Sequence, residues 1–75
     1  MVSVIFQFDR THTAQIAAVT AYVADRDIKT REVWSTFVRV AMEYQASEED
    51  LDELCHFARC TAKLLGIVWY DAVPY

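Results

Sequence analysis

The chain has 75 residues, 55% of them hydrophobic, and a net charge of −4 at pH 7. This length allows a single domain, residues 1–75. An acidic chain repels the phosphate backbone of nucleic acids, so we do not expect nucleic-acid binding. With one glycine and one proline, the sequence has no glycine-rich phosphate loop and no glycine-framed nucleophile motif, which excludes most motif-defined enzymes.

The first predicted element is a strand over residues 2–8. Val2, Val4, Phe6 and Phe8 alternate with a second set of side chains, in the period-two pattern of a sheet with one buried face. We therefore expect this strand to contribute one face to the core.

A first helix is predicted to follow, up to about residue 24. Asp9, Thr11 and Thr13 are candidate N-caps for it. Much of its surface is alanine, which favours helix and lets another helix approach closely. The large apolar residues form one stripe, composed of Ile16, Val19, Tyr22 and Val23.

A second helix is predicted from Thr30 to about Gln45, after a polar connection over residues 25–29. Trp34, Val38 and Met42 would widen its apolar arc to roughly 200°. Either neighbouring helices cover both sides of it, or these three residues contact another chain. The core face of this helix would be Val33, Phe37, Val40, Ala41 and Tyr44.

A third helix is predicted to begin after Ser47, which can cap the amide of Asp50, and Gly66 is the predicted residue just beyond its end. Phe57 and Leu64 lie roughly opposite the core stripe of this helix, so they form a second candidate interface. The acidic start is explained by the helix dipole or by docking of a basic partner. The acidic residues proposed for docking are Glu48, Glu49 and Asp52.

Residues 67–73 are rich in strand formers and complete the predicted order β-α-α-α-β. The predicted fold class is α+β, a three-helix layer packed on a small sheet formed by the N- and C-terminal strands. A two-stranded sheet leaves two open edges, and pairing with a second copy would cover one of them. We therefore expect a homodimer.

Few residues suggest chemistry. His56 and Cys60 are one helical turn apart and could face one metal, but zinc needs four ligands, or three and water, so we expect neither metal nor cofactor. A Cys60 nucleophile would need an electropositive setting, and its surroundings are acidic. Cys55 and Cys60 diverge by about 140° on a helix, so we expect no disulfide between them.

The chain begins without a basic segment and a long apolar core, and no run approaches the roughly 20 apolar residues of a membrane span. We therefore expect a cytoplasmic protein with reduced thiols and no membrane contact.

These observations predict a small non-enzymatic protein that binds and modulates a larger protein or complex, most simply as an inhibitor. A phage or mobile-element accessory protein directed against a host defence complex fits this size and composition. One alternative is a small DNA-binding transcription regulator that uses the basic residues Arg26, Lys29, Arg31 and Arg39. The other is a small enzyme or ligand carrier whose site lies at a dimer interface.

Overall fold

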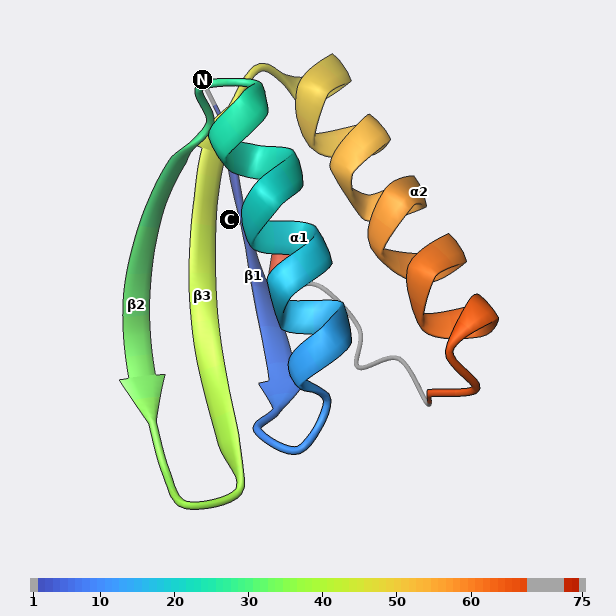
Figure 1. The fold of residues 1–75 in the computed structure, drawn as a ribbon. Helices are drawn as coiled ribbons and strands as arrows, with labels where there is room; N and C mark the ends of the chain where they lie inside the picture. The colour runs from blue at the N-terminus through green and yellow to red at the C-terminus, as the bar shows by residue number, and fades with distance from the viewer. Residues whose placement is uncertain (1, 68–72, 75) are drawn as a thin grey trace.

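The structure, a computed structural model, describes residues 2–67, 73 and 74. The strands form one antiparallel sheet in the order β2-β3-β1-β4, and both helices pack against the same face of it (Figure 1). This is the split βαβ arrangement, in which β1 and β2 run parallel with β3 between them. The elements are β1 (Val2–Asp9), α1 (Thr13–Asp25), β2 (Lys29–Ser35), β3 (Arg39–Ala46), α2 (Glu48–Leu64) and β4 (Val73–Pro74).

The predicted order β-α-α-α-β with a three-helix layer is wrong, because residues 30–45 form most of the β2–β3 hairpin instead of a helix. The apolar residues of this segment fit a helical spacing, but from Val40 onward they also alternate with period two. Val40 and Tyr44 lie opposite Phe8 and Val4 of β1, and all four are buried. Pairing with β1 therefore buries Val40, Ala41 and Tyr44 of the predicted core face but not Phe37, and it also satisfies the β1 backbone.

The predicted pairing of the two terminal strands is present where it is described. Val73 pairs with Ile5, and Pro74 pairs with Val4. β1 is nevertheless not half of a two-stranded sheet, because its other edge pairs with β3 along its whole length. Residues 68–72 of the predicted last strand lie outside the described residues.

The core lies between the sheet and the two helices. Phe6 and Phe8 are almost completely buried, with their rings 6.0 Å apart and close to perpendicular. Phe6 also contacts the ring of Tyr44 at 5.1 Å, and burial raises the pKa of that phenol. The helices contribute Val19 and Leu54, neither of which is exposed.

The start of α1 differs from the predicted capping. His12 occupies the N-cap without a side-chain hydrogen bond. Asp9 instead accepts hydrogen bonds from the hydroxyl and the amide of Thr11, at 2.7 and 2.9 Å, which hold the turn before the helix. The Thr11 hydroxyl, followed by its amide, lowers the pKa of Asp9 because both stabilise the carboxylate.

A buried glutamine links the two helices. Gln15 is 2% exposed and donates from Nε2 to the carbonyl oxygen of Ala58 at 3.3 Å. Ala58 and Ala62 are buried on α2, and their small side chains let α1 approach closely enough for this contact. The predicted alanine surface of α1 is not this contact, because the buried residues of the helix are Gln15, Val19 and Val23, and its alanines are exposed except for the half-buried Ala18.

Both predicted ends of α2 are confirmed. The Ser47 hydroxyl accepts from the amide of Asp50 at 3.2 Å. At the other end, Gly66 has φ +69°. The amide of Gly66 donates to the carbonyl oxygen of Lys63, and the amide of Ile67 donates to the carbonyl oxygen of Ala62. These two bonds form a Schellman motif, which requires the left-handed conformation that glycine adopts without strain.

Candidate functional site

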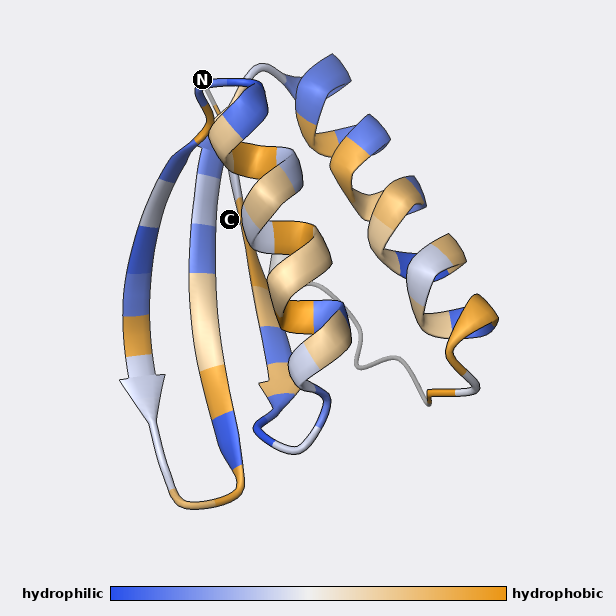
Figure 2. Cartoon of the chain, viewed as in Figure 1, coloured by the Kyte–Doolittle hydropathy of each residue, from blue (hydrophilic) through white to orange (hydrophobic). Residues whose placement is uncertain are grey.

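The most exposed apolar residues of the β2–β3 hairpin lie at its tip. Phe37 is 102% exposed and Val38 is 59% exposed, and they join Ser35–Thr36 to β3. Figure 2 shows this loop as an apolar segment beside more hydrophilic parts of β2. Full exposure of a phenylalanine is unfavourable in water, so this side chain is available for a partner.

Polar contacts behind the loop hold this tip in one conformation. The Thr36 hydroxyl accepts from the amides of Val38 and Arg39 at 3.2 and 3.0 Å, and the Thr36 amide donates to the Arg39 carbonyl at 2.8 Å. From the neighbouring β1–α1 turn, Arg10 donates its amide to Val38 and its Nε to Thr36. The loop is therefore tied to a second segment, while Phe37 within it is fully exposed.

An open depression of about 550 Å³ lies beside the tip. It is lined by Arg10, Ser35, Thr36 and Phe37, which give it one aromatic wall, two hydroxyl groups and a guanidinium. Such a combination suits a peptide or protein side chain with both apolar and hydrogen-bonding parts. We define the tip site as Phe37, Val38 and the residues that line this depression.

Trp34 extends the apolar surface along β2. It is 41% exposed and lies opposite Ala41, which pairs with Gln7 on β1. Directly opposed residues project to the same side of a sheet, so Trp34 lies on the face turned away from the helices. An aromatic residue on this face, close to the tip, is a second contact that a partner could use.

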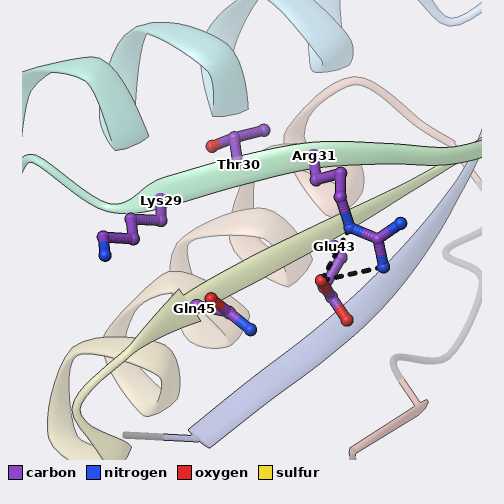
Figure 3. A pocket seen from close by; sticks show the side chains of 5 residues that line it. All are labelled: Lys29, Thr30, Arg31, Glu43 and Gln45. Carbon is purple, nitrogen blue, oxygen red and sulfur yellow. Dashed lines mark hydrogen bonds and ion pairs between the residues drawn. The ribbon is translucent and has the colours of Figure 1, made fainter.

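The same sheet face carries a partly buried ion pair. Arg31 of β2 donates from Nε and Nη2 to one carboxylate oxygen of Glu43 at 3.2 and 3.1 Å. The Arg31 side chain is 64% exposed and that of Glu43 is 9% exposed. Figure 3 shows the Arg31 guanidinium lying over Glu43 at one end of a depression of about 200 Å³, which Lys29, Thr30 and Gln45 also line. Because Glu43 already neutralises Arg31, this depression is a weak candidate for an anion site.

The outer edge of β2 is poorly suited to pairing with another strand. It lies at the end of the sheet and carries Lys29, Arg31 and Glu32. A bulge between Glu32 and Trp34 shifts the register by one residue. Charges and bulges are the features that discourage edge-to-edge association, so the exposed tip is a better candidate for docking than this edge.

Comparison with protein-family models, curated proteins and solved structures finds no significant match to this chain.

A second candidate surface is a groove of about 610 Å³ on the outer side of the helices. Its floor is formed by Tyr22 of α1 and Phe57 of α2, whose rings stack with centroids 4.3 Å apart. Arg26 lies over Tyr22, with its guanidinium carbon 3.6 Å from the ring centroid. The rest of the groove is lined by Asp52, Glu53, His56 and Cys60 of α2.

The two cysteines have different surroundings. Both are free: Cys60 is exposed, with Sγ 3.6 Å from Nε2 of His56, whereas Cys55 is half-buried. Burial raises the pKa of Cys55, Arg59 opposes this shift, and Asp52 adds to it. Among the described residues, no group of three or more His, Cys, Asp or Glu side chains is placed to hold a metal ion.

The structure separates the three residues that were predicted to share one face of a helix. Trp34 lies on the sheet face away from the helices, and Val38 lies at the hairpin tip. Met42 is opposite Phe6, on the helix-facing side of β3, where it packs against the core. The predicted interface of Trp34, Val38 and Met42 is therefore not a continuous surface, although Trp34 and Val38 remain exposed.

The predicted residues of α2 lie on two parts of that helix. Glu48 and Glu49 are exposed in the first turn, and Asp52 follows at the edge of the groove. Leu64 is 87% exposed near the C-terminal end, whereas Phe57 is half-buried against Tyr22. Only Leu64 is an exposed apolar residue of the kind predicted for this face.

Phe37 was missed, because the predicted helix assigned it to the core. The signal that could have found it is the polar pair Ser35–Thr36 before Phe37–Val38, between two runs of strand formers.

No helix among the described residues is long and apolar enough to cross a membrane.

Proposed function

We propose that this chain is a non-enzymatic protein that binds a larger protein through the tip site and thereby modulates it, most simply by inhibition. The observation that carries the proposal is the complete exposure of Phe37 on a loop held by hydrogen bonds from Thr36 and Arg10. An aromatic side chain presented on a preorganised loop loses little conformational entropy when it enters a pocket.

The structure offers less support for the DNA-binding alternative. A helix-turn-helix unit needs two helices joined by a short turn, whereas α1 and α2 are separated by the β2–β3 hairpin. The basic residues proposed to contact phosphate are also partly neutralised, because Arg31 pairs with Glu43 and Arg26 pairs with Asp25. A protein partner is therefore our preferred interpretation.

Site-specific photocrosslinking in cells that express the protein tests this proposal. A photoreactive phenylalanine analogue is placed at position 37 in one variant and at position 64 in another, because both native side chains are strongly exposed. We expect position 37 to crosslink a discrete partner protein, and position 64 not to crosslink that protein. Phe37→Ser should abolish recovery of that same protein in a pull-down, whereas Leu64→Ser should leave recovery unchanged.

A matched melting temperature for the two serine variants controls for folding. If position 64 crosslinks the partner and position 37 does not, docking at the tip is wrong and the partner binds α2.

A further inference from the structure

The exposed surface of α2 carries two metal-binding side chains side by side. His56 and Cys60 are four residues apart in the helix and both are exposed. Their nearest donor atoms, Nε2 and Sγ, are 3.6 Å apart. Residues at this spacing lie on one face of a helix, so both atoms can be presented to one ion.

The distance between these atoms matches a zinc chelate. Zinc–nitrogen bonds of about 2.0–2.1 Å and zinc–sulfur bonds of about 2.3 Å, at a tetrahedral angle, place the two donors about 3.6 Å apart. The separation of the two donor atoms in the structure is therefore already that of a zinc chelate.

Charged side chains of both signs surround this pair. Asp52 lies one turn before His56, and Asp52 and Glu53 line the same groove as His56 and Cys60. Cations are also present: the Arg26 guanidinium lies over the Tyr22 ring, and α2 carries Arg59 next to Cys60 and Lys63 three residues beyond it. The two carboxylates lie eight and seven residues before Cys60 and closer to His56, so they attract a divalent cation toward the His56 end of the pair.

One chain cannot complete such a site. Zinc takes four protein ligands, or three and a water molecule, and no third suitable donor joins this pair among the described residues. A second copy related by a two-fold axis would add the same two donors and give a Cys2His2 set, in which two thiolates neutralise the charge of the ion. The same contact would cover Leu64, which is 87% exposed one turn beyond Cys60.

We propose that His56 and Cys60 bind zinc, and that His56 and Cys60 of a second copy complete the site, so that zinc joins two chains through α2. This surface is distinct from the tip site, so the inference stands whether or not Phe37 binds a partner. It also gives the expected homodimer a different contact from pairing of strand edges.

Cobalt titration tests the ligand set. The purified chain, kept reduced with a phosphine, is titrated with Co²⁺ while thiolate-to-metal charge-transfer and tetrahedral ligand-field absorption are recorded. We expect both bands to saturate at one Co²⁺ per two chains. Cys60→Ser should remove the charge-transfer band, and His56→Gln should weaken binding by at least about tenfold. Cys55→Ser is the matched control, because Cys55 is half-buried, and should behave as the native chain.

Light scattering with added Zn²⁺ tests the second copy. The native chain and Cys55→Ser should double in mass with zinc and return to monomers with EDTA, whereas Cys60→Ser and His56→Gln should remain monomers. Saturation at one ion per chain without a change in mass would overturn the shared site. Metal binding that survives both Cys60→Ser and His56→Gln would overturn the ligand assignment.

Discussion

Glu43 is a buried carboxylate on the sheet face turned away from the helices, and the partner shown for it is Arg31. The two residues are not equivalent, because Arg31 is 64% exposed and can be hydrated without Glu43. Glu43, at 9% exposure, depends on the guanidinium to replace the water it has lost. The stabilising effect of the pair therefore lies mainly in preventing an unpaired buried charge.

Replacing Arg31 should consequently cost more than neutralising Glu43. Arg31→Leu leaves the carboxylate without its partner, and we expect it to lower the free energy of unfolding by about 1–3 kcal/mol. Glu43→Gln keeps an acceptor oxygen for Arg31 and should cost less than about 1 kcal/mol. Urea denaturation of both variants measures the difference. Equal losses would show that the carboxylate is hydrated despite its low exposure.

The sequence predicts which of these residues are exposed better than it predicts the secondary-structure element that carries them. Trp34 and Val38 were proposed as contacts because they widened the apolar arc of a helix, and they are exposed for a different reason, at and near a hairpin tip. His56 and Cys60 were placed on one helical face correctly, because helical spacing alone determines that relation. The stacking of Phe57 on Tyr22 could not be predicted, since it depends on the angle at which α1 and α2 meet.

The β2–β3 hairpin is the element that sequence patterns concealed. Two-residue hairpin loops usually need positive φ angles, which glycine or asparagine supply, and the sequence has neither at the turn. Among the described residues, positive φ occurs only at Asp27 and Gly66, so this loop forms without it. The Thr36 hydroxyl instead accepts hydrogen bonds from the amides of Val38 and Arg39, and the pair Ser35–Thr36 is a weaker turn signal in a sequence than glycine or asparagine.

The Thr36 hydroxyl should therefore determine how well the tip is ordered. Thr36→Val keeps the shape of the side chain and removes this acceptor, so we expect a loss of about 0.5–1.5 kcal/mol in unfolding free energy. Partner capture through position 37 should fall as well, because a mobile Phe37 must be ordered on binding. Thr36→Ser is the control and should retain most of both. Unchanged capture by Thr36→Val would show that preorganisation of the loop does not contribute.

Elements whose ends are marked by local chemistry were predicted well. The capping of α2 by Ser47 and its termination at Gly66 each depend on residues within one or two turns. The strand β1 was predicted from the alternation of apolar residues along its own sequence, which does not depend on the strands that pair with it. The hairpin failed because its apolar positions suit both a helix and a strand, and only pairing with β1 decides between them.

For the whole molecule, the central position of β1 decides the topology. Strands pair with it on both edges, and the helices cover the side that carries Phe6 and Phe8. The predicted three-helix layer was incompatible with this arrangement, because it left the C-terminal strand as the only strand that could pair with β1. Once residues 29–35 and 39–46 are strands, β2 takes the outermost position, next to β3 alone.

This arrangement predicts a gradient of stability across the sheet, which amide hydrogen exchange can measure. Amides of β1 and β3, in the middle of the sheet, should exchange only on global unfolding, whereas outward-facing amides of β2 should exchange through local opening or directly with water. Zinc should slow exchange in α2 near His56 and Cys60 and leave β2 unchanged. If β2 amides are as slow as those of β3, and become faster on dilution, a second chain pairs with the β2 edge. In that case the bulge and charges of β2 do not prevent association, and the dimer contact is the sheet edge instead of α2.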